Sequence, residues 1–353
     1  MKRLIIVASL AILAVGCQKT FVENEVLTPI GFNTEVGKQT RALVTTGKYP
    51  TDQPFGVYSY GYQDGENTPS STPMPNVQVS RQAVPNTDPV AYTYKATTGT
   101  YYWPNNPETT LSFYAYSPYI GVGATATAND KKMTVTGFNH DVTTGFRFTG
   151  YTHADTGVDF MIATPVTGAT FDDQNGDATD KNPKDASVPV DFNHMMTQVK
   201  FNVSTSYAGV NFAVKSITLK NVGNIGNFSE KETPAWAVTG TADYTVVANL
   251  TSDNVVTSNA SYTSPGVTML PQTIDANSLH SFEIKYEVSG DGVATETVTR
   301  EVKLNTAPAY VSWAMNKCVT YNVTIGLKEI NFEPTVAGWA TPEVTGGEYT
   351  IFQ

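Results

Sequence analysis

The strongest constraint on the fold is an alternation of apolar and polar residues with a period of two. It is clearest where apolar residues alternate with charged or polar ones, at Phe282, Ile284, Tyr286 and Val288 and again through residues 319–325. Successive side chains of a strand point to opposite faces of a sheet, so this pattern predicts strands with one buried face. No long stretch shows a helical period, and the sequence therefore predicts an all-β fold.

Further short runs follow the same rule and are separated by turn-forming Gly, Pro, Asn and Asp residues. They lie at residues 30–36, 55–62, 111–116, 133–136, 146–148, 160–164, 199–203, 217–220 and 302–304. Many short strands joined by such turns are typical of β-sandwiches with Greek-key connections. The polar stretches 65–77 and 245–263 are expected to be surface loops or irregular edges.

The first residues resemble an export signal. Lys2 and Arg3 precede an apolar run at 4–15, which is too short for a membrane span but suits a signal peptide. The run ends at Gly16 and Cys17, as in lipoprotein signals, where the cysteine becomes the acylated N-terminus, although Ala14 stands where leucine is usual. The alternative is an ordinary secretory signal with an incidental cysteine. The other cysteine, Cys318, is expected to be a buried, inert thiol.

Length and charge narrow the class of protein. A chain of 353 residues suggests about two domains. The net charge is −10, and Lys and Arg are not clustered, so the field of the protein repels phosphate backbones and nucleic-acid binding is not expected. Residues 172–185 contain no large apolar side chain and are expected to form a loop between the domains. Their carboxylates suggest calcium, but the EF-hand spacing is absent, so a solvated loop is the preferred interpretation.

The sequence contains no catalytic motif. A zinc-protease motif, a phosphate-binding glycine loop and a nucleophile elbow are all absent. His140, His153 and His280 lie in polar contexts, and His194 is better interpreted as a hydrogen-bonded structural histidine than as a zinc ligand. No enzymatic activity, metal or cofactor is therefore expected.

The abundant aromatic residues have two interpretations. Tyr58, Tyr60 and Tyr62 alternate along one expected strand and could stack on sugars, but such residues more often pack across strands. Packing is also expected for three of the four tryptophans, Trp236, Trp313 and Trp339.

Two features are unusual for a plain surface domain. Lys38 and Arg41 lie in a polar joint after the strand at 30–36, where a trypsin-like protease could cut. Gly346 and Gly347 precede an apolar end at 349–352, and a free apolar strand promotes aggregation unless it has a place to dock. Together these features suggest one strand that can be removed and another that can be donated.

These features together resemble the fimbrillin family of Bacteroidales, the subunits of type V pili. The resemblance spans nearly the whole chain and rests on Cys17, Thr40-Arg41-Ala42, Tyr102-Trp103-Pro104, residues 111–117 and 159–164, Phe192-Asn193-His194, Val199-Lys200-Phe201, Trp313, Tyr321-Asn322-Val323 and residues 330–339. It implies two tandem transthyretin-like Greek-key β-sandwich domains without enzymatic activity. The implied organisation is a lipoprotein signal peptide at 1–16, a propeptide with a removable strand at 17–41, sandwich domains at 42–186 and 187–339, and a tail at 340–353.

The resemblance also implies a route of maturation. A precursor held in the outer membrane by lipid on Cys17 would be cut between Arg41 and Ala42 by an arginine-specific protease. The lost strand carries Ile30, Phe32, Thr34 and Val36 on one face, and a neighbouring subunit would replace it with a tail carrying Tyr349, Ile351 and Phe352. Main-chain pairing and alternate side chains would supply the affinity. Because a one-residue slip exchanges the two faces, the register of the tail stays open.

The implied partners are other fimbrial subunits, in a homo- or heteropolymer at the cell surface, and a receptor on a host or bacterial surface. Two rival functions remain, a tip adhesin of a pilus and a monomeric glycan-binding surface lipoprotein. The cleavable joint at Arg41 favours a polymerising subunit, because a monomeric glycan binder has no use for a removable strand.

Overall fold

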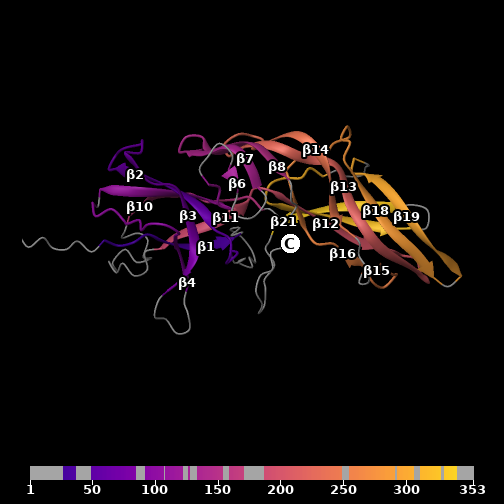
Figure 1. Ribbon diagram of the computed structural model, residues 1–353. Coiled ribbons are helices and arrows are strands. Elements are labelled where there is room, and N and C mark those ends of the chain that lie inside the picture. Colours follow the sequence, from indigo (N-terminus) through magenta and orange to yellow (C-terminus); the bar gives the residue numbers. More distant parts are fainter. Residues whose placement is uncertain are drawn as a thin grey trace, which may run out of the picture.

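The computed structural model describes residues 27–36, 49–84, 92–106, 108–121, 126–127, 133–153, 159–170, 187–248, 254–290, 292–305, 311–326 and 330–339. Within these ranges all the regular secondary structure is β-strand, which confirms the all-β prediction. The finer assignment to two tandem transthyretin-like Greek-key domains stays a prediction. Figure 1 shows an elongated molecule with the early strands at one end and the late strands at the other.

The first eleven strands make up the N-terminal half. They are β1 (Gly31–Val36), β2 (Phe55–Gln63), β3 (Ser71–Ala83), β4 (Tyr92–Ala96), β5 (Thr109–Ser117), β6 (Ala126–Thr127), β7 (Met133–Asp141), β8 (Gly145–His153), β9 (Met161–Ala163), β10 (Val166–Ala169) and β11 (Ser187–His194). The sheet order is β10-β5-β2-β3-β4-β1-β11-β9, and β9 pairs with β5 as well. Hydrogen bonding therefore closes seven of these strands into a ring, in which β1 lies between β4 and β11.

The remaining ten strands make up the C-terminal half. They are β12 (Thr197–Ser204), β13 (Val210–Ser229), β14 (Trp236–Val247), β15 (Val255–Val256), β16 (Tyr262–Thr263), β17 (Val267–Met269), β18 (Ser281–Gly290), β19 (Val293–Lys303), β20 (Lys317–Ile325) and β21 (Ile330–Gly338). One sheet contains β16, β17, β12, β20 and β21, and the other is built on β13, β18 and β19. Phe201 of β12 and Phe282 of β18 meet between them, with ring centroids 5.1 Å apart. The two sheets thus share one apolar core.

The two halves are joined by strands that cross between them. The second sheet of the C-terminal half also contains β8, β7 and β6, because β8 pairs with the end of the 20-residue strand β13. In the other direction, β11 begins at Ser187 and pairs with β1 and β9 of the N-terminal ring. Sheet membership therefore crosses the boundary predicted between 186 and 187, and the domain limits 42–186 and 187–339 stay a prediction.

A separate apolar core fills the space where the halves meet. Phe148 of β8 lies against Phe160, Phe228 and Trp236, with ring centroids 5.1 to 5.5 Å apart. Trp339, at the end of the described chain, belongs to the same cluster. The expected packing of Trp236, Trp313 and Trp339 is confirmed, since all three are buried.

Two sequence expectations are wrong in detail. Residues 65–77 are not only a loop, because β3 runs through them and buries Met74 and Val77. The β3 face was missed because Pro and Asn interrupt its alternation. Cys318 is half-exposed rather than buried, with its thiol 3.4 Å from the Gln198 side chain, because only its neighbour Val319 faces the core. His140 and His153, which have polar neighbours in the sequence, are buried and hydrogen-bond Tyr60 and Tyr151.

Candidate functional site

The site begins with strand β1, which completes the N-terminal ring. Its six residues pair in parallel with β11, from Gly31 opposite Ser187 to Val36 opposite Phe192. On its other edge β1 runs antiparallel to β4, with Phe32 opposite Tyr94. In Figure 1 β1, β4 and β11 lie together in the N-terminal half of the molecule.

The residues before β1 extend the pairing to a second segment. The Ile30 backbone N–H donates to the Tyr101 carbonyl at 2.8 Å, and the Trp103 N–H donates to the Thr28 carbonyl at 3.0 Å. Pro29 and Tyr102 form the bridge between these two bonds. The stretch from Thr28 to Val36 is therefore held along both edges by backbone hydrogen bonds.

One face of this stretch fills the interior of the ring. Ile30 is 5% exposed and Phe32 is 3% exposed, whereas Asn33, on the opposite face of the strand, is exposed to solvent. Phe32 meets Phe55 of β2 and Phe113 of β5 edge to face, each at 6.0 Å between ring centroids. Full burial of such a side chain contributes about 1.5–3 kcal/mol, so these two residues account for much of what holds the strand.

The next inward position is polar. Thr34 is half-buried, and its side chain shares a hydrogen bond with the Tyr94 hydroxyl. Burial raises the pKa of Tyr94, so this phenol stays protonated at neutral pH and keeps its hydrogen-bonding capacity. The groove that β1 fills therefore accepts two apolar side chains followed by a polar one.

One buried donor beside the groove has no partner. Trp103 is 2% exposed, and its indole Nε1 lacks a hydrogen-bond acceptor. Its ring contacts Phe113 at 5.6 Å between centroids, in the same core as Ile30 and Phe32. An orphaned buried N–H is rare and costs about 1–3 kcal/mol.

Beyond β1 the described chain resumes at Tyr49, which is anchored in the same core. Tyr49 is 2% exposed, stacks on Phe192 of β11 at 4.9 Å between centroids, and hydrogen-bonds the Ser117 hydroxyl at 2.7 Å. Burial raises the pKa of Tyr49 well above its ordinary value, so the phenol is neutral at pH 7. The predicted cleavage residues Arg41 and Ala42 thus fall between two segments that each pack in the ring.

The predicted site residues divide into two groups. Of the strand residues, Ile30 and Phe32 lie inside the ring, Thr34 lies at its polar position, and the backbone of Val36 ends β1. Outside the described residues lie the other members of the predicted site, Cys17, Arg41, Ala42, Tyr349, Ile351, Phe352 and the loop 172–185. Their predicted roles stay predictions.

Sequence reasoning missed the residues that receive the strand. Tyr94, Trp103 and the strand β11 come from three segments that are far apart in the chain. The pairing of β1 with β11 spans more than 150 residues, and no local pattern identifies a parallel partner at such a distance. Alternation at Val188, Val190 and Phe192 was a signal that could have placed β11 in a core.

A second group of polar side chains lies at the junction of the halves. The imidazole Nδ1 of His194 lies 2.7 Å from the Asp159 carboxylate, and its ring stacks on Trp339 at 4.0 Å between centroids with an interplanar angle of 6°. This confirms the interpretation of His194 as a hydrogen-bonded structural residue. The stack fixes the end of the described chain next to β11, whose last residue is His194.

The tyrosine stripe is a packing element. Tyr58 and Tyr60 of β2 lie 5.4 and 5.5 Å from the His140 ring, and Tyr60 donates its hydroxyl to the His140 carbonyl. Burial lowers the pKa of His140 to about 4, so the imidazole is neutral at pH 7. Its Nδ1 lies 3.0 Å from the Tyr60 oxygen, which can accept the Nδ1 proton. The expected packing of these tyrosines is confirmed.

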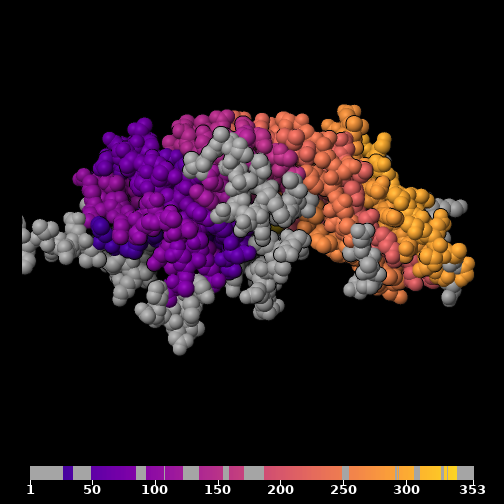
Figure 2. Space-filling model, in the orientation of Figure 1, coloured from indigo at the N-terminus to yellow at the C-terminus, as the bar shows by residue number. Residues whose placement is uncertain are grey.

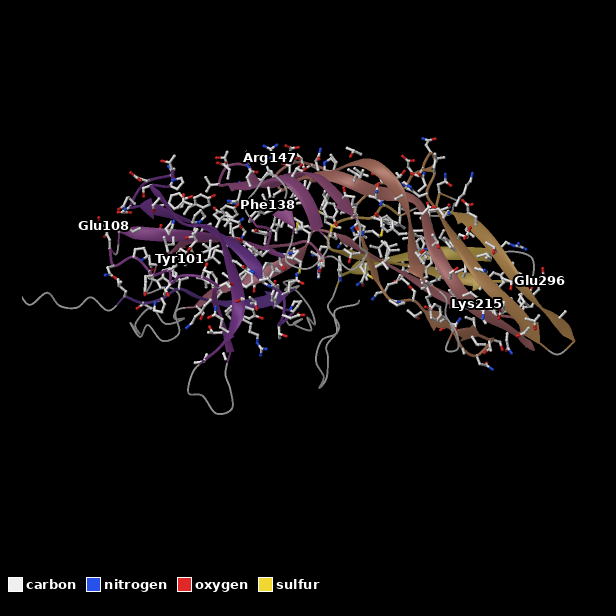
Figure 3. The ribbon with its side chains drawn as sticks, viewed as in Figure 1. Tyr101, Glu108, Phe138, Arg147, Lys215 and Glu296 are labelled. Atoms are coloured by element: carbon white, nitrogen blue, oxygen red, sulfur yellow. The ribbon has the colours of Figure 1, made fainter. Side chains whose placement is uncertain are left out.

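The described part of the chain holds no group of three or more His, Cys, Asp or Glu side chains that could bind a metal ion. None of the described residues forms a helix long and apolar enough to cross a membrane. In Figure 3 the labelled Tyr101 lies at the groove end, whereas Lys215 and Glu296 lie at the far end of the molecule.

Comparison with known proteins identifies relatives of this chain. Residues 40–339 match the model of a family described as fimbrillin-like. A fimbrial protein from Bacteroides vulgatus has a similar structure, with a TM-score of 0.57 and 17% identity over 88% of this chain and 99% of that one. The tip fimbrial protein Mfa3 from Porphyromonas gingivalis is 8% identical, over 82% of this chain and 95% of that one, with a TM-score of 0.36. No curated protein matches the chain in sequence.

Proposed function

Because this chain belongs to the fimbrillin-like family, we propose that it is a structural subunit of a cell-surface fimbria of the type V pilus class and has a role in adhesion. Its precursor is a lipoprotein of the outer membrane, held there through Cys17. An arginine-specific protease removes the segment up to Arg41, and polymerisation follows by donor-strand exchange with other fimbrial subunits. No catalytic role is proposed for it.

The observation that carries the proposal is the place of β1 in the ring. β1 is the first described strand, it is six residues long, and it is inserted between β4 and β11. The stretch that contains β1 contributes Ile30 and Phe32 to the interior. Its only covalent link to the rest of the ring runs through residues 37–48. A cut in that segment leaves a strand held by non-covalent contacts alone.

Loss of the strand would leave a groove suited to another strand. Backbone donors and acceptors of β11 on one side, and of β4 and Tyr101–Trp103 on the other, would lose their partners. The rings of Phe55 and Phe113 would be exposed to water where Phe32 had been. A sheet edge with open pockets favours addition of a new strand, because pairing restores the hydrogen bonds and the pockets take alternate side chains.

After β1 leaves, the chain that follows the cut is still held in the core of the ring by Tyr49. Tyr49 follows the cut and stacks on Phe192, the last register partner of β1 on β11. The cut subunit therefore keeps its new N-terminal segment packed beside the groove while the groove opens.

The rival function of a glycan-binding lipoprotein has less support. Its main sequence argument was the tyrosine stripe, and Tyr58 and Tyr60 are packed against His140 instead of lying free on the surface. A tip adhesin would share the groove but not the donated tail, so it is distinguished by the assembly experiment below.

The test is assembly of the purified precursor after treatment with an arginine-specific protease. We expect the wild-type protein to convert from monomer to a ladder of oligomers on gel electrophoresis. Arg41→Ala should stay monomeric and folded, and a variant lacking residues 347–353 should be cut but not polymerise. Arg300→Ala, which removes an arginine from the paired strand β19, is the matched control and should polymerise normally.

Normal polymers from both Arg41→Ala and the tail deletion would contradict the proposal and leave the glycan-binding function ahead. A wild-type protein that is cut after Arg41 but forms no polymers, with or without its tail, would favour the tip adhesin.

A further inference from the structure

We propose that the tail of a second copy of this chain enters the β1 groove in one register, with Tyr349 in the place of Ile30, Ile351 in the place of Phe32 and Gln353 in the place of Thr34. The inference rests on the proposed function, because it assumes that β1 leaves. It goes further by assigning each inward position of the groove to one tail residue. Phe352 then faces away from the groove.

The groove has a defined chemical order along the path of β1. Position 28 is nearly buried, with Thr28 9% exposed. Positions 30 and 32 are apolar, and position 34 lies beside the Tyr94 hydroxyl. A strand running in the direction of β1 must therefore present a small residue at position 28, apolar residues at positions 30 and 32, and a polar residue at position 34.

The tail fits this order in one register only. With Ile351 at position 32, Gly347 falls at position 28, Tyr349 at position 30 and Gln353 at position 34. The amide of Gln353 can then replace the Thr34 hydroxyl as the partner of Tyr94, since an amide both donates and accepts hydrogen bonds.

The neighbouring registers place the wrong chemistry inside. With Phe352 at position 32, Thr350 enters the apolar position 30 and Glu348 enters the nearly buried position 28. A buried carboxylate without a partner is strongly unfavourable. With Tyr349 at position 32, Gly347 leaves the Ile30 pocket empty and Ile351 lies at the polar position beside Tyr94.

The unpartnered indole of Trp103 independently favours tyrosine at position 30. Thr28 and Trp103 flank the bridge between Pro29 and Tyr102, so Trp103 lies diagonally across from position 30 on the same inward face. Diagonal neighbours on antiparallel strands are about 7–8 Å apart, a span that an aromatic side chain covers. Ile30 offers no acceptor to the Trp103 Nε1, whereas the Tyr349 hydroxyl does. Exchange would thus satisfy a buried donor that the precursor leaves without a partner.

The first test places a charge at each tail position of the full-length precursor. After cleavage, Ile351→Asp should abolish polymer formation, because its carboxylate would enter the pocket between Phe55 and Phe113. Phe352→Asp should polymerise as the wild type does, because position 33 of the groove is exposed in the precursor. The opposite result, or polymerisation of both variants, would overturn the register.

The second test reads the register directly by cross-linking. Phe32 and Tyr94 are register partners, and Cα atoms of directly opposite antiparallel residues lie about 4.5–5.5 Å apart, within disulfide range. In a Cys318→Ser background, polymers of the Tyr94→Cys, Ile351→Cys variant should therefore become covalent under oxidation. The matched variant Tyr94→Cys, Phe352→Cys should not, and covalent polymers from this variant alone would overturn the assignment.

The third test concerns the indole. Tyr349→Phe removes only the hydroxyl and should weaken the polymer about tenfold in its resistance to dissociation, the effect of one buried hydrogen bond. In a Trp103→Phe background the same change should have no effect, because the donor is gone. An equal effect of Tyr349→Phe in both backgrounds would overturn the contact. Absence of polymer from the cleaved wild type would instead overturn the proposed function, so the two failures are distinguishable.

Discussion

Phe32 meets Phe113 edge to face, with ring centroids 6.0 Å apart and ring planes inclined by 84°. The two residues come from β1 and β5, which are not neighbours in the ring, so the contact crosses its interior. A strand that completes a ring and also fills part of its interior has a large effect on stability for its length. Figure 2 shows the outer face of the N-terminal half, coloured indigo to magenta, at one end of the elongated molecule.

The first prediction concerns this contact in the precursor. Phe32→Ala should destabilise the N-terminal half by about 3–5 kcal/mol, because it removes a buried ring and leaves a cavity beside Phe55 and Phe113. Denaturant unfolding followed by tryptophan fluorescence measures the loss. Asn33→Ala, on the exposed face of the same strand, should change stability by less than about 0.5 kcal/mol. Equal effects of the two variants would contradict the inward placement of Phe32.

The second prediction concerns the opening of the ring. After cleavage at Arg41 and removal of the tail by deletion of 347–353, backbone amides of β4 and β11 should exchange with deuterium faster than in the precursor, because their partner strand is free to leave. Amides of β18 and β20, in the C-terminal sandwich, provide the internal reference and should keep their protection. Unchanged protection along β11 would mean that β1 stays bound after the cut.

The third prediction concerns the N-terminus. Protein exported by its native host should begin at Cys17 and carry lipid on that residue, with 1–16 absent, as mass spectrometry of the purified precursor would show. Cys17→Ala should abolish the lipid and release the protein from the membrane fraction or leave its leader uncleaved. An intact leader on the exported wild-type protein would contradict the assignment.

The fourth prediction concerns pH. Burial holds the pKa of His140 at about 4, below the value of 6.5 expected for an exposed histidine. Between these values the unfolded chain binds a proton that the folded chain does not, so stability from this group is complete above pH 6.5 and falls as the pH is lowered to 4. The full loss is about 3 kcal/mol, since one pKa unit corresponds to about 1.4 kcal/mol.

The variant His140→Phe tests this directly. It keeps a ring against Tyr114 and Phe146 but cannot bind a proton, so its stability should depend less on pH between 4 and 6.5 than that of the wild type. Denaturant unfolding at several pH values gives the comparison. Identical pH dependence of the two proteins in that window would show that His140 does not titrate as described.

The fifth prediction concerns the stack at the end of the described chain. Trp339 is 8% exposed, lies flat on His194 and donates its backbone N–H to the Asn316 carbonyl at 3.1 Å. Trp339→Ala should cost about 3–5 kcal/mol, whereas Trp339→Phe should cost less because a ring still covers His194. Thermal unfolding separates the two. Equal losses would mean that the stack itself contributes little.

The local pattern of the sequence determined much of this protein. Alternation at Phe282–Val288 and Val319–Ile325 placed β18 and β20 correctly, because a strand with one buried face must alternate whatever it pairs with. The same argument located β1 and identified Ile30 and Phe32 as its inward residues. The buried tryptophans and the structural role of His194 were also predictable, since large aromatics and isolated histidines rarely remain free.

Only the tertiary structure decided which strands meet. The parallel pairing of β1 with β11, the closure of the ring through β9 and β5, and the place of Trp103 beside Thr28 join segments far apart in the chain. Hydrogen bonds between backbones are the same for every sequence, so pairing partners are chosen by packing across the whole interior rather than by any local pattern. The sequence by itself therefore determined that a short apolar strand precedes Arg41, and the fold decided that this strand completes the ring.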